Sequence, residues 1–518
     1  MSKSRSKNLF MNVFIGYIAQ IGIMLLSFIG RRIFVEFLSV EYLGINGLYG
    51  NILSVLAIAE LGLGNVTQFF LYKPIAEGKY SYTNSLFGYF KKLYTIIAVI
   101  VLLFGLALIP FLKYIVNGNL NQIELIIYYV LFLLNSVVTY FSAPHISLLA
   151  ASQDNRLHKI VTLFTSLILT LLHIVVLLIF KNYMVYVVAT LITTILNVVI
   201  INILCGKKYP YIKKAQYNNE LINKIDIINK LKATFVYKIG AVIVNNTDNI
   251  LISLMVGTTE VGLYSNYYMP ISAIQTCLAI ITTSLISGIG NLSANGNKNH
   301  MYKVFKLMIW FYHFIGATFG ILLYFLVDEF ISLWLGREFV MNKIVVFAIA
   351  MNFYTSNVIS PVWMFRETNG LFEKVKYLLL CTALVNVIAS VVLGNYMATA
   401  GILLATSIAR ILTQVWYEPN ILIKNVFNKS QKEYWIKQGK YFLVTVVCFI
   451  ICYFISGMFA DGIIFVIIKT FIFFIVCSVM FLLASCKDEE FYVIKSYIYS
   501  ALKTVYKFIK GEKEDYEF

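Results

Sequence analysis

The chain has 518 residues, of which 60% are hydrophobic and 13% are charged, and its formal net charge is +17. The mean hydropathy of +0.79 and a charged fraction about half the roughly 25% of soluble domains exclude a soluble globular protein. Apolar runs of about 20 residues, the length that crosses a bilayer, follow one another almost end to end. We therefore predict an all-α, polytopic membrane protein.

The amino-terminal segment MSKSRSKNLF is basic and leads into a long apolar run without a small-residue cleavage site. We interpret this run as a retained first membrane helix and not as a removed signal peptide. Including this run, the sequence predicts fourteen spans: 11–37, 43–71, 93–112, 123–149, 160–180, 183–204, 233–256, 262–290, 307–327, 344–365, 377–394, 397–419, 441–459 and 463–485. An even number of spans places both termini on one side of the membrane.

The distribution of Lys and Arg predicts the orientation. With the amino terminus inside, 33 of the 42 basic residues fall in cytoplasmic segments and six in outer ones, while Lys238, Arg410 and Lys469 fall within spans. Basic residues accumulate in cytoplasmic loops, so both termini are expected in the cytoplasm. This bias also accounts for the net positive charge, and we expect no nucleic-acid partner because no stacking groove or RNA motif is present.

Two landmarks suggest an internal repeat. The stretch EYLGINGLY at 41–49 is echoed by EVGLYSNYY at 260–268, with Gly44 and Gly262 218 residues apart, and Pro144 and Pro361 are 217 residues apart. Many transporters consist of two such halves with the substrate path between them. The expected organisation is an N-lobe (1–204, six spans), a cytoplasmic amphipathic linker (205–232), a C-lobe (233–424, six spans), two further spans (425–485) and a cytoplasmic interfacial tail (486–518) that attracts anionic lipid.

Polar residues recur on one helical face of the first span of each half. With the offset of 218, Gln20 corresponds to Lys238 and Arg31 corresponds to Asn249. Asn245 shares the face of the seventh span, Asp248 lies beside it, and span twelve carries Arg410. Charged groups in hydrocarbon are costly, so we expect these faces to turn toward a wet cavity.

The cations among these residues suggest an anionic substrate, because guanidinium groups match phosphate geometry. We expect a cationic cavity that binds the substrate through Arg31, Arg32, Lys238, Arg410, Gln20, Asn245 and Asn249. A simpler interpretation also exists for Arg31 and Arg32, because cations near the end of a span can extend to lipid headgroups.

Two acidic residues within spans are candidates for ion coupling. Asp248 has amide and hydroxyl neighbours, and Glu60 lies centrally in the second span. Either residue can relay a proton or bind Na⁺; the alternatives are a structural ion pair for Asp248 and a buried, protonated packing role for Glu60. His145, His173 and His313 are not spaced as metal ligands, so we interpret them as hydrogen-bonded polar groups within spans and predict no metal and no cofactor beyond a coupling ion, H⁺ or Na⁺.

The stretch EYLGINGLYGNILSVLAIAELGLGNVTQFFLYKPIA (41–76), followed by TDNILISLMVGTTEVGLYSNYYM (247–269), resembles polysaccharide flippases of the Wzx type. These belong to the multidrug/oligosaccharidyl-lipid/polysaccharide superfamily. The resemblance implies an ion-coupled alternating-access transporter of the bacterial plasma membrane, and the absence of a GxxxxGK phosphate loop agrees with a transporter that does not use ATP. The implied cargo is an oligosaccharide on undecaprenyl pyrophosphate, and further expected partners are membrane lipids, a polysaccharide polymerase and other assembly proteins.

Other functions remain open at this point. A drug or cation antiporter would share the fold, but its cavity should be acidic. A polymerase or glycosyltransferase usually carries a sizeable outer catalytic loop, and here the longest outer loop, 328–343, has about sixteen residues. A flippase for lipid II or a teichoic-type precursor would differ only in the sugar of its cargo. We therefore predict a flippase for capsule, O-antigen or other surface polysaccharide, and no enzyme.

Overall fold

The computed structural model describes residues 3–60, 62–118, 120–152, 154–212, 224–294, 298–375, 377–460, 462–488 and 491–492. These residues are almost entirely helical, and no strand occurs among them. Every predicted span falls on helical structure, which confirms the all-α fold class. Within the described part, ten helical segments are long and apolar enough to cross a membrane. Most of the predicted interfacial tail, and the middle of the predicted linker, lie outside the described residues.

The chain divides into two compact units. The first comprises Met1–Ala273 and Lys376–Ile402, and the second comprises Ile274–Val375 and Leu403–Phe518. The N-lobe and C-lobe boundaries remain a prediction.

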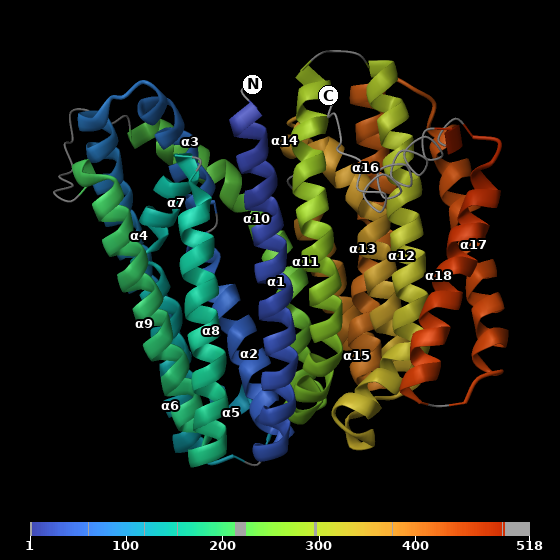
Figure 1. The fold of residues 1–518 in the computed structure, drawn as a ribbon, viewed down its shortest axis with the longest axis horizontal. Coiled ribbons are helices and arrows are strands. Elements are labelled where there is room, and N and C mark those ends of the chain that lie inside the picture. Colours follow the sequence, from blue (N-terminus) through green and yellow to red (C-terminus); the bar gives the residue numbers. More distant parts are fainter. Residues whose placement is uncertain are drawn as a thin grey trace. The chain divides into compact units, whose positions relative to one another are not determined.

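The first unit holds the helices of the amino-terminal half and parts of two later ones (Figure 1). They are α1 (Lys3–Phe37), α2 (Val40–Leu56), η1 (Ala57–Glu60), α3 (Leu63–Ala76), α4 (Tyr80–Ala107), η2 (Ile109–Phe111), α5 (Leu112–Ile115), α6 (Gln122–Thr139), α7 (Ala143–Ala151), α8 (Asn155–Phe180), α9 (Tyr183–Lys208), η3 (Pro210–Ile212), α10 (Lys224–Met255), the start of α11 (Thr258–Ala294) and the start of α15 (Leu378–Leu412). Helix α8 packs on α1 and α9, α6 packs on α9, and α2 packs on α10.

Tightly packed aromatic side chains fill part of this first core. Phe34 of α1 lies edge-on to Tyr183 and Tyr186 of α9, with ring centroids 6.2 and 5.0 Å apart. The Tyr183 hydroxyl donates a hydrogen bond of 2.8 Å to Asn46 Oδ1. The buried phenol is thereby satisfied, as an apolar surrounding requires.

The repeat landmarks Gly44 and Gly262 contact each other. A Cβ at Gly44 of α2 would lie 1.9 Å from the Thr258 carbonyl oxygen, and a Cβ at Gly262 of α11 would lie 2.2 Å from the Val40 carbonyl oxygen and 3.0 Å from the Gly44 nitrogen. Only glycine allows two helix backbones to approach this closely, as in other membrane helix contacts. A two-fold axis through this crossing would produce such a self-pairing of equivalent residues.

The second unit is built on α12 (Lys298–Trp334), which packs on α13, α17 and α18. Its other elements are the remainders of α11 and α15, η4 (Arg337–Phe339), α13 (Lys343–Thr368), α14 (Phe372–Val375), α16 (Gln414–Leu422), the π-helix η5 (Ile423–Phe427), α17 (Gln431–Ser456) and α18 (Ile463–Ser485). Among the described residues, two ion pairs with a buried cation join different helices of this unit. Lys469 of α18 binds Glu329 of α12 at 2.6 Å, and Arg366 of α13 binds Glu418 of α16 at 2.8 Å.

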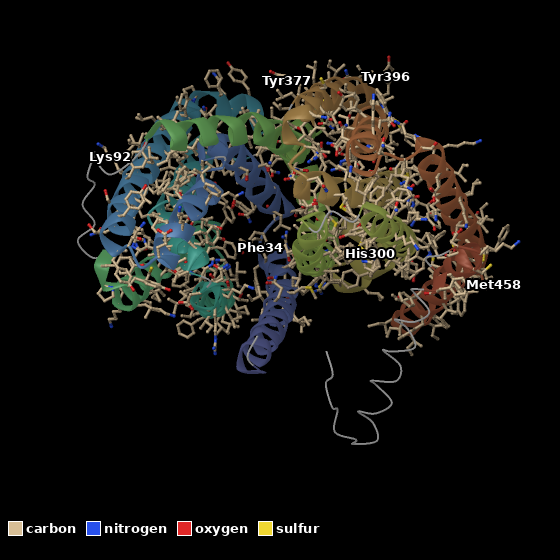
Figure 2. All side chains as sticks on the ribbon, turned by 90° about the horizontal axis from the view of Figure 1, so that it is seen from above. Phe34, Lys92, His300, Tyr377, Tyr396 and Met458 are labelled. Carbon is tan, nitrogen blue, oxygen red and sulfur yellow. The ribbon has the colours of Figure 1, made fainter. Side chains whose placement is uncertain are left out.

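Helix α15 contains a sharp reversal where the sequence predicts the end of one span and the start of the next. Ala398 has φ 50° and ψ −134°, and a Cβ at Gly401 would lie 2.1 Å from the Leu393 carbonyl oxygen. Tyr396 on this turn is 85% exposed and points outward in Figure 2. The two spans are therefore joined almost without a loop.

Candidate functional site

Arg31 is partly buried in the first unit. Its guanidinium Nη1 donates a hydrogen bond of 3.0 Å to Ser265 Oγ on α11, and Ser265 in turn donates to the Gly262 carbonyl oxygen at 2.7 Å. The ring of Tyr186 lies nearby. No carboxylate in the described part of the chain forms an ion pair with Arg31, so its charge has only neutral protein partners there.

The other cations of the predicted cavity differ in their settings. Arg32 is exposed on α1, and Gln20 on the same helix is partly buried. Lys238 lies on α10, but its side chain lies outside the described residues. Arg410 belongs to the second unit, where its Nη1 donates to the Asn352 carbonyl oxygen at 3.3 Å. A cavity shared by these cations remains a prediction.

The amide-rich stretch of α10 lies against α2. Asn245 is exposed, whereas Asp248 and Asn249 are partly buried. The Asn249 side chain lies close to Gly47 of α2, and its Oδ1 is buried without a hydrogen-bond partner. Two residues earlier on α10, Thr247 donates to Asn386 Oδ1 of α15 at 3.3 Å.

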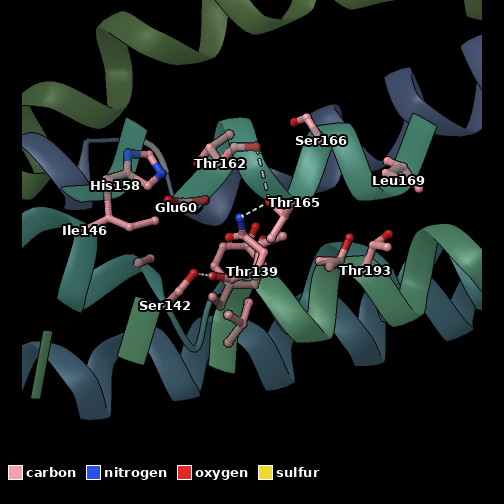
Figure 3. Close-up of a pocket in the computed structure, with 15 residues that line it drawn as sticks. Glu60, Thr139, Ser142, Ile146, His158, Thr162, Thr165, Ser166, Leu169 and Thr193 are labelled. Atoms are coloured by element: carbon pink, nitrogen blue, oxygen red, sulfur yellow. Dashed lines mark hydrogen bonds between the residues drawn. The ribbon is translucent and has the colours of Figure 1, made fainter. Parts of the chain in front are cut away.

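Glu60 opens onto a cavity within the first unit (Figure 3). The cavity has a volume of about 440 Å³. The Tyr140 hydroxyl lies near the Glu60 carboxylate. The other lining residues are mostly hydroxyl or amide side chains from the α6–α7 corner, α8 and α9: Thr139, Ser142, Ala143, Ile146, His158, Thr162, Thr165, Ser166, Leu169, Thr193, Thr194, Asn197 and Val198.

Hydrogen bonds fix the walls of this cavity. Asn197 Nδ2 of α9 donates to Thr165 Oγ1 of α8 at 2.7 Å, and Thr165 Oγ1 donates to the Val161 carbonyl oxygen at 3.0 Å. Ser142 donates to the Thr139 carbonyl oxygen at 3.0 Å. Among the described lining residues Glu60 is the one carboxylate, and it faces mostly uncharged side chains.

The sequence analysis did not predict several of these residues. Glu60 was expected as a coupling residue, but the cavity around it and its neighbour Tyr140 were not. A signal was present, because Thr162, Thr165 and Ser166 in the fifth span and Thr193, Thr194 and Asn197 in the sixth cluster at helical spacing. Ser265 had no such signal, since its role depends on its contact with a helix more than 200 residues away.

Comparison with known proteins identifies the family. The sequence model of the family described as "Polysaccharide biosynthesis protein" matches residues 9–286, more than half of the chain. The chain belongs to this family. A search of curated proteins finds no match.

Solved structures support the fold. The inward closed conformation of the lipid II flippase MurJ aligns with a TM-score of 0.68 at 14% identity, covering 92% of this chain and 99% of that one. An inward-facing multidrug resistance MATE transporter aligns with a TM-score of 0.62 at 15% identity, covering 79% of this chain and 99% of that one. A Pyrococcus furiosus transporter, reported with a binding pocket of reverse polarity, aligns with a TM-score of 0.55 at 13% identity. The alignment covers 81% of this chain and 95% of that one. The polysaccharide family member therefore has the fold of the multidrug/oligosaccharidyl-lipid/polysaccharide superfamily and is a multi-pass membrane protein.

Proposed function

We propose that this family member is a flippase. It moves undecaprenyl-pyrophosphate-linked oligosaccharide units from the inner to the outer leaflet of the bacterial plasma membrane, for export of capsule, O-antigen or another surface polysaccharide. The observation that carries the proposal is Arg31, a cation within a membrane helix whose described hydrogen-bond partner is a neutral hydroxyl. A charge in this setting is costly unless it binds something, and an anionic lipid-linked cargo supplies the missing partner.

The pyrophosphate is the part of the cargo that Arg31 recognises. A guanidinium group can donate two parallel hydrogen bonds to a phosphate, and such charge-assisted bonds are about twice as strong as neutral ones. In the proposal, Arg32, Lys238, Arg410 and the amides of Gln20, Asn245 and Asn249 also contact the cargo. The prenyl chain stays in the lipid phase, since it gains nothing from a polar path.

Ion exchange at Glu60 or Asp248 resets the cycle in this proposal, with H⁺ or Na⁺ as the coupling ion and no other cofactor. Glu60 is the better supported of the two, because it faces a cavity lined in part by hydroxyl and amide side chains. Binding of the ion neutralises the carboxylate, which lowers the cost of moving it within the membrane.

The proposed setting follows the charge bias of the loops. Both termini face the cytoplasm, where the basic segments contact anionic lipid headgroups. A polysaccharide polymerase and other assembly proteins receive the cargo on the outer side. No chemical change to the glycan is part of the proposal.

Deletion of the gene tests this function directly. The lipid extract of the deleted strain should contain complete undecaprenyl-linked repeat units that face the cytoplasm, and surface polysaccharide should disappear. Short or absent units would instead indicate an assembly enzyme. Normal units with normal surface glycan would indicate a drug or cation antiporter, which efflux assays would then identify.

A further inference from the structure

The cavity beside Glu60 extends along α8 for several turns. Its lining includes His158 in the first turn of α8 and Leu169 eleven residues later. At a rise of 1.5 Å per residue, this stretch is about 16 Å long. The cavity therefore extends from one end of the helix to its middle.

The end that holds His158 is the cytoplasmic one in the orientation that the loop charges predict. Arg156 and Lys159 belong to the basic residues of that side, and basic residues mark the cytoplasmic ends of spans. Figure 3 shows His158, Thr162 and Glu60 at one end of the cavity, and Leu169 and Thr193 at the other.

The chemistry of the lining suits water. The volume of about 440 Å³ has room for on the order of ten water molecules, each of which occupies about 30 Å³ in the liquid. The Thr162 hydroxyl is buried without a hydrogen-bond partner among the described residues. A buried hydroxyl of this kind is normally paired, and ordered water is a common partner.

We propose that this cavity is hydrated and opens to the cytoplasm at His158, and that Glu60, which lies near this opening, exchanges a proton with the cytoplasm through it. The inference rests on the proposed ion-coupled function and names its coupling ion. The protonated Glu60 carboxyl gives its proton to a water molecule and becomes a carboxylate. The proton then passes along the water to the cytoplasm, so charge and atoms balance without a further reactant.

The architecture favours a proton over Na⁺. Hard cations take several oxygen ligands at close distance, and carboxylates are prominent among them. Among the described lining residues, one is a carboxylate. A proton needs only the carboxylate and a path.

Cysteine accessibility tests whether the cavity opens to the cytoplasm. Ser166, deep in the lining, is replaced by Cys in a full-length protein whose exposed Cys277, Cys381 and Cys486 have been changed to Ser. The matched control is Val161→Cys, because Val161 lies on the same helix but is buried outside the lining. Tyr396→Cys, on the exposed turn of α15, reports which side of each vesicle is outward.

We expect a membrane-impermeant, charged methanethiosulfonate to label S166C at least tenfold faster than V161C in inside-out vesicles, and not in right-side-out vesicles. His158→Trp should slow this labelling at least tenfold by filling the mouth. Equal rates for S166C and V161C, or labelling of S166C from the outer side, would overturn the cytoplasmic opening. If S166C does not fold, Thr162→Cys serves as the probe.

The identity of the ion is tested at one fixed pH. Dicyclohexylcarbodiimide modifies protonated carboxyl groups within membranes, and mass spectrometry detects the adduct on Glu60, with Glu60→Gln as the blank. Equal modification in sodium chloride and choline chloride is expected, whereas protection by Na⁺ would overturn the assignment of a proton. Neither experiment needs cargo, so these outcomes are independent of whether the flippase proposal holds.

Discussion

In the proposed function, Arg31 is the cation that recognises the cargo. Replacing Arg31 by Gln keeps a polar side chain but removes the charge and the fork of donors. Loss of a charge-assisted hydrogen bond costs about 1.5–3 kcal/mol, which corresponds to roughly a ten- to hundredfold loss of affinity at 1.4 kcal/mol per tenfold. We expect Arg31→Gln to reduce surface polysaccharide at least tenfold and Arg31→Lys to give an intermediate amount, measured by immunoblot at equal amounts of folded protein in the membrane.

The control for this variant is Lys113→Gln, since Lys113 is an exposed basic residue at the end of α5, outside the proposed site. Surface polysaccharide in the control should match the parent strain. Full export by Arg31→Gln would show that the cargo does not depend on this cation.

Glu60 is expected to control the cycle and not the folding. Glu60→Gln retains the size and the hydrogen-bonding capacity of the side chain but cannot take up and release a proton. Export should stop in this variant, while Glu60→Asp should recover part of it. Glu77→Gln is the control, because Glu77 is outside the spans and pairs with Lys79 on the surface. A Glu60→Gln strain that exports normally would move ion coupling to another group.

The sequence predicts individual residues unevenly. It placed Glu60 and Arg31 among the important polar groups because charges within apolar spans are visible without any contact information. It also predicted that His313 is a satisfied polar group, which is confirmed by hydrogen bonds to Tyr354 Oη at 3.1 Å and Gln438 Oε1 at 2.6 Å. The partners themselves were beyond prediction, because they lie on other helices and no spacing rule links them.

At the scale of helices, the glycine crossing of α2 and α11 sets how closely the two can pack. Gly44→Ala places a methyl group within 1.9 Å of a backbone oxygen, so the helices must separate. Overpacking of this kind costs about 1–3 kcal/mol. We expect Gly44→Ala to lower the unfolding temperature in detergent, as measured by tryptophan fluorescence.

Gly50→Ala on the same helix provides the matched control. Nothing lies within 4 Å of a Cβ at Gly50, and alanine is the better helix former. This variant should be as stable as the parent or slightly more stable. A Gly44→Ala protein with unchanged stability would contradict the close crossing.

The ion pair between α12 and α18 anchors the last span. Lys469 is 2% exposed and Glu329 22%, so Lys469→Met leaves a poorly hydrated carboxylate without its partner. Breaking a buried pair in this way costs about 3 kcal/mol. The double variant Lys469→Met with Glu329→Gln should recover most of the lost stability, and a thermal-unfolding double-mutant cycle measures the difference. Additive losses would show that the two residues do not interact.

For the whole molecule, the loop charges predict one orientation. Alkaline phosphatase fused after residue 518 should be inactive, and a fluorescent protein fused there should be bright, because both reporters indicate a cytoplasmic carboxyl terminus. The reverse result would show that the predicted orientation is wrong and that His158 lies at the outer side. A fusion in the 328–343 loop, with the opposite expected signals, is the control.

The fold as a whole was more predictable than the site. Length and hydropathy were sufficient to predict the helices, because each membrane helix must be apolar over its whole length. The two motifs around Gly44 and Gly262 led to the correct polysaccharide biosynthesis family. The cavity at Glu60 could not be derived in the same way, since it depends on how four separate segments pack and not on the composition of any one of them.

The tight reversal at Ala398 has a consequence for biogenesis. Because almost no loop joins the two arms of α15, the second arm cannot enter the bilayer long after the first. That second arm carries the polar residues Thr406 and Arg410, whereas the first arm is mostly apolar. We expect the translocon to release both arms together as a helical hairpin, so that the apolar arm carries the charged one into the lipid.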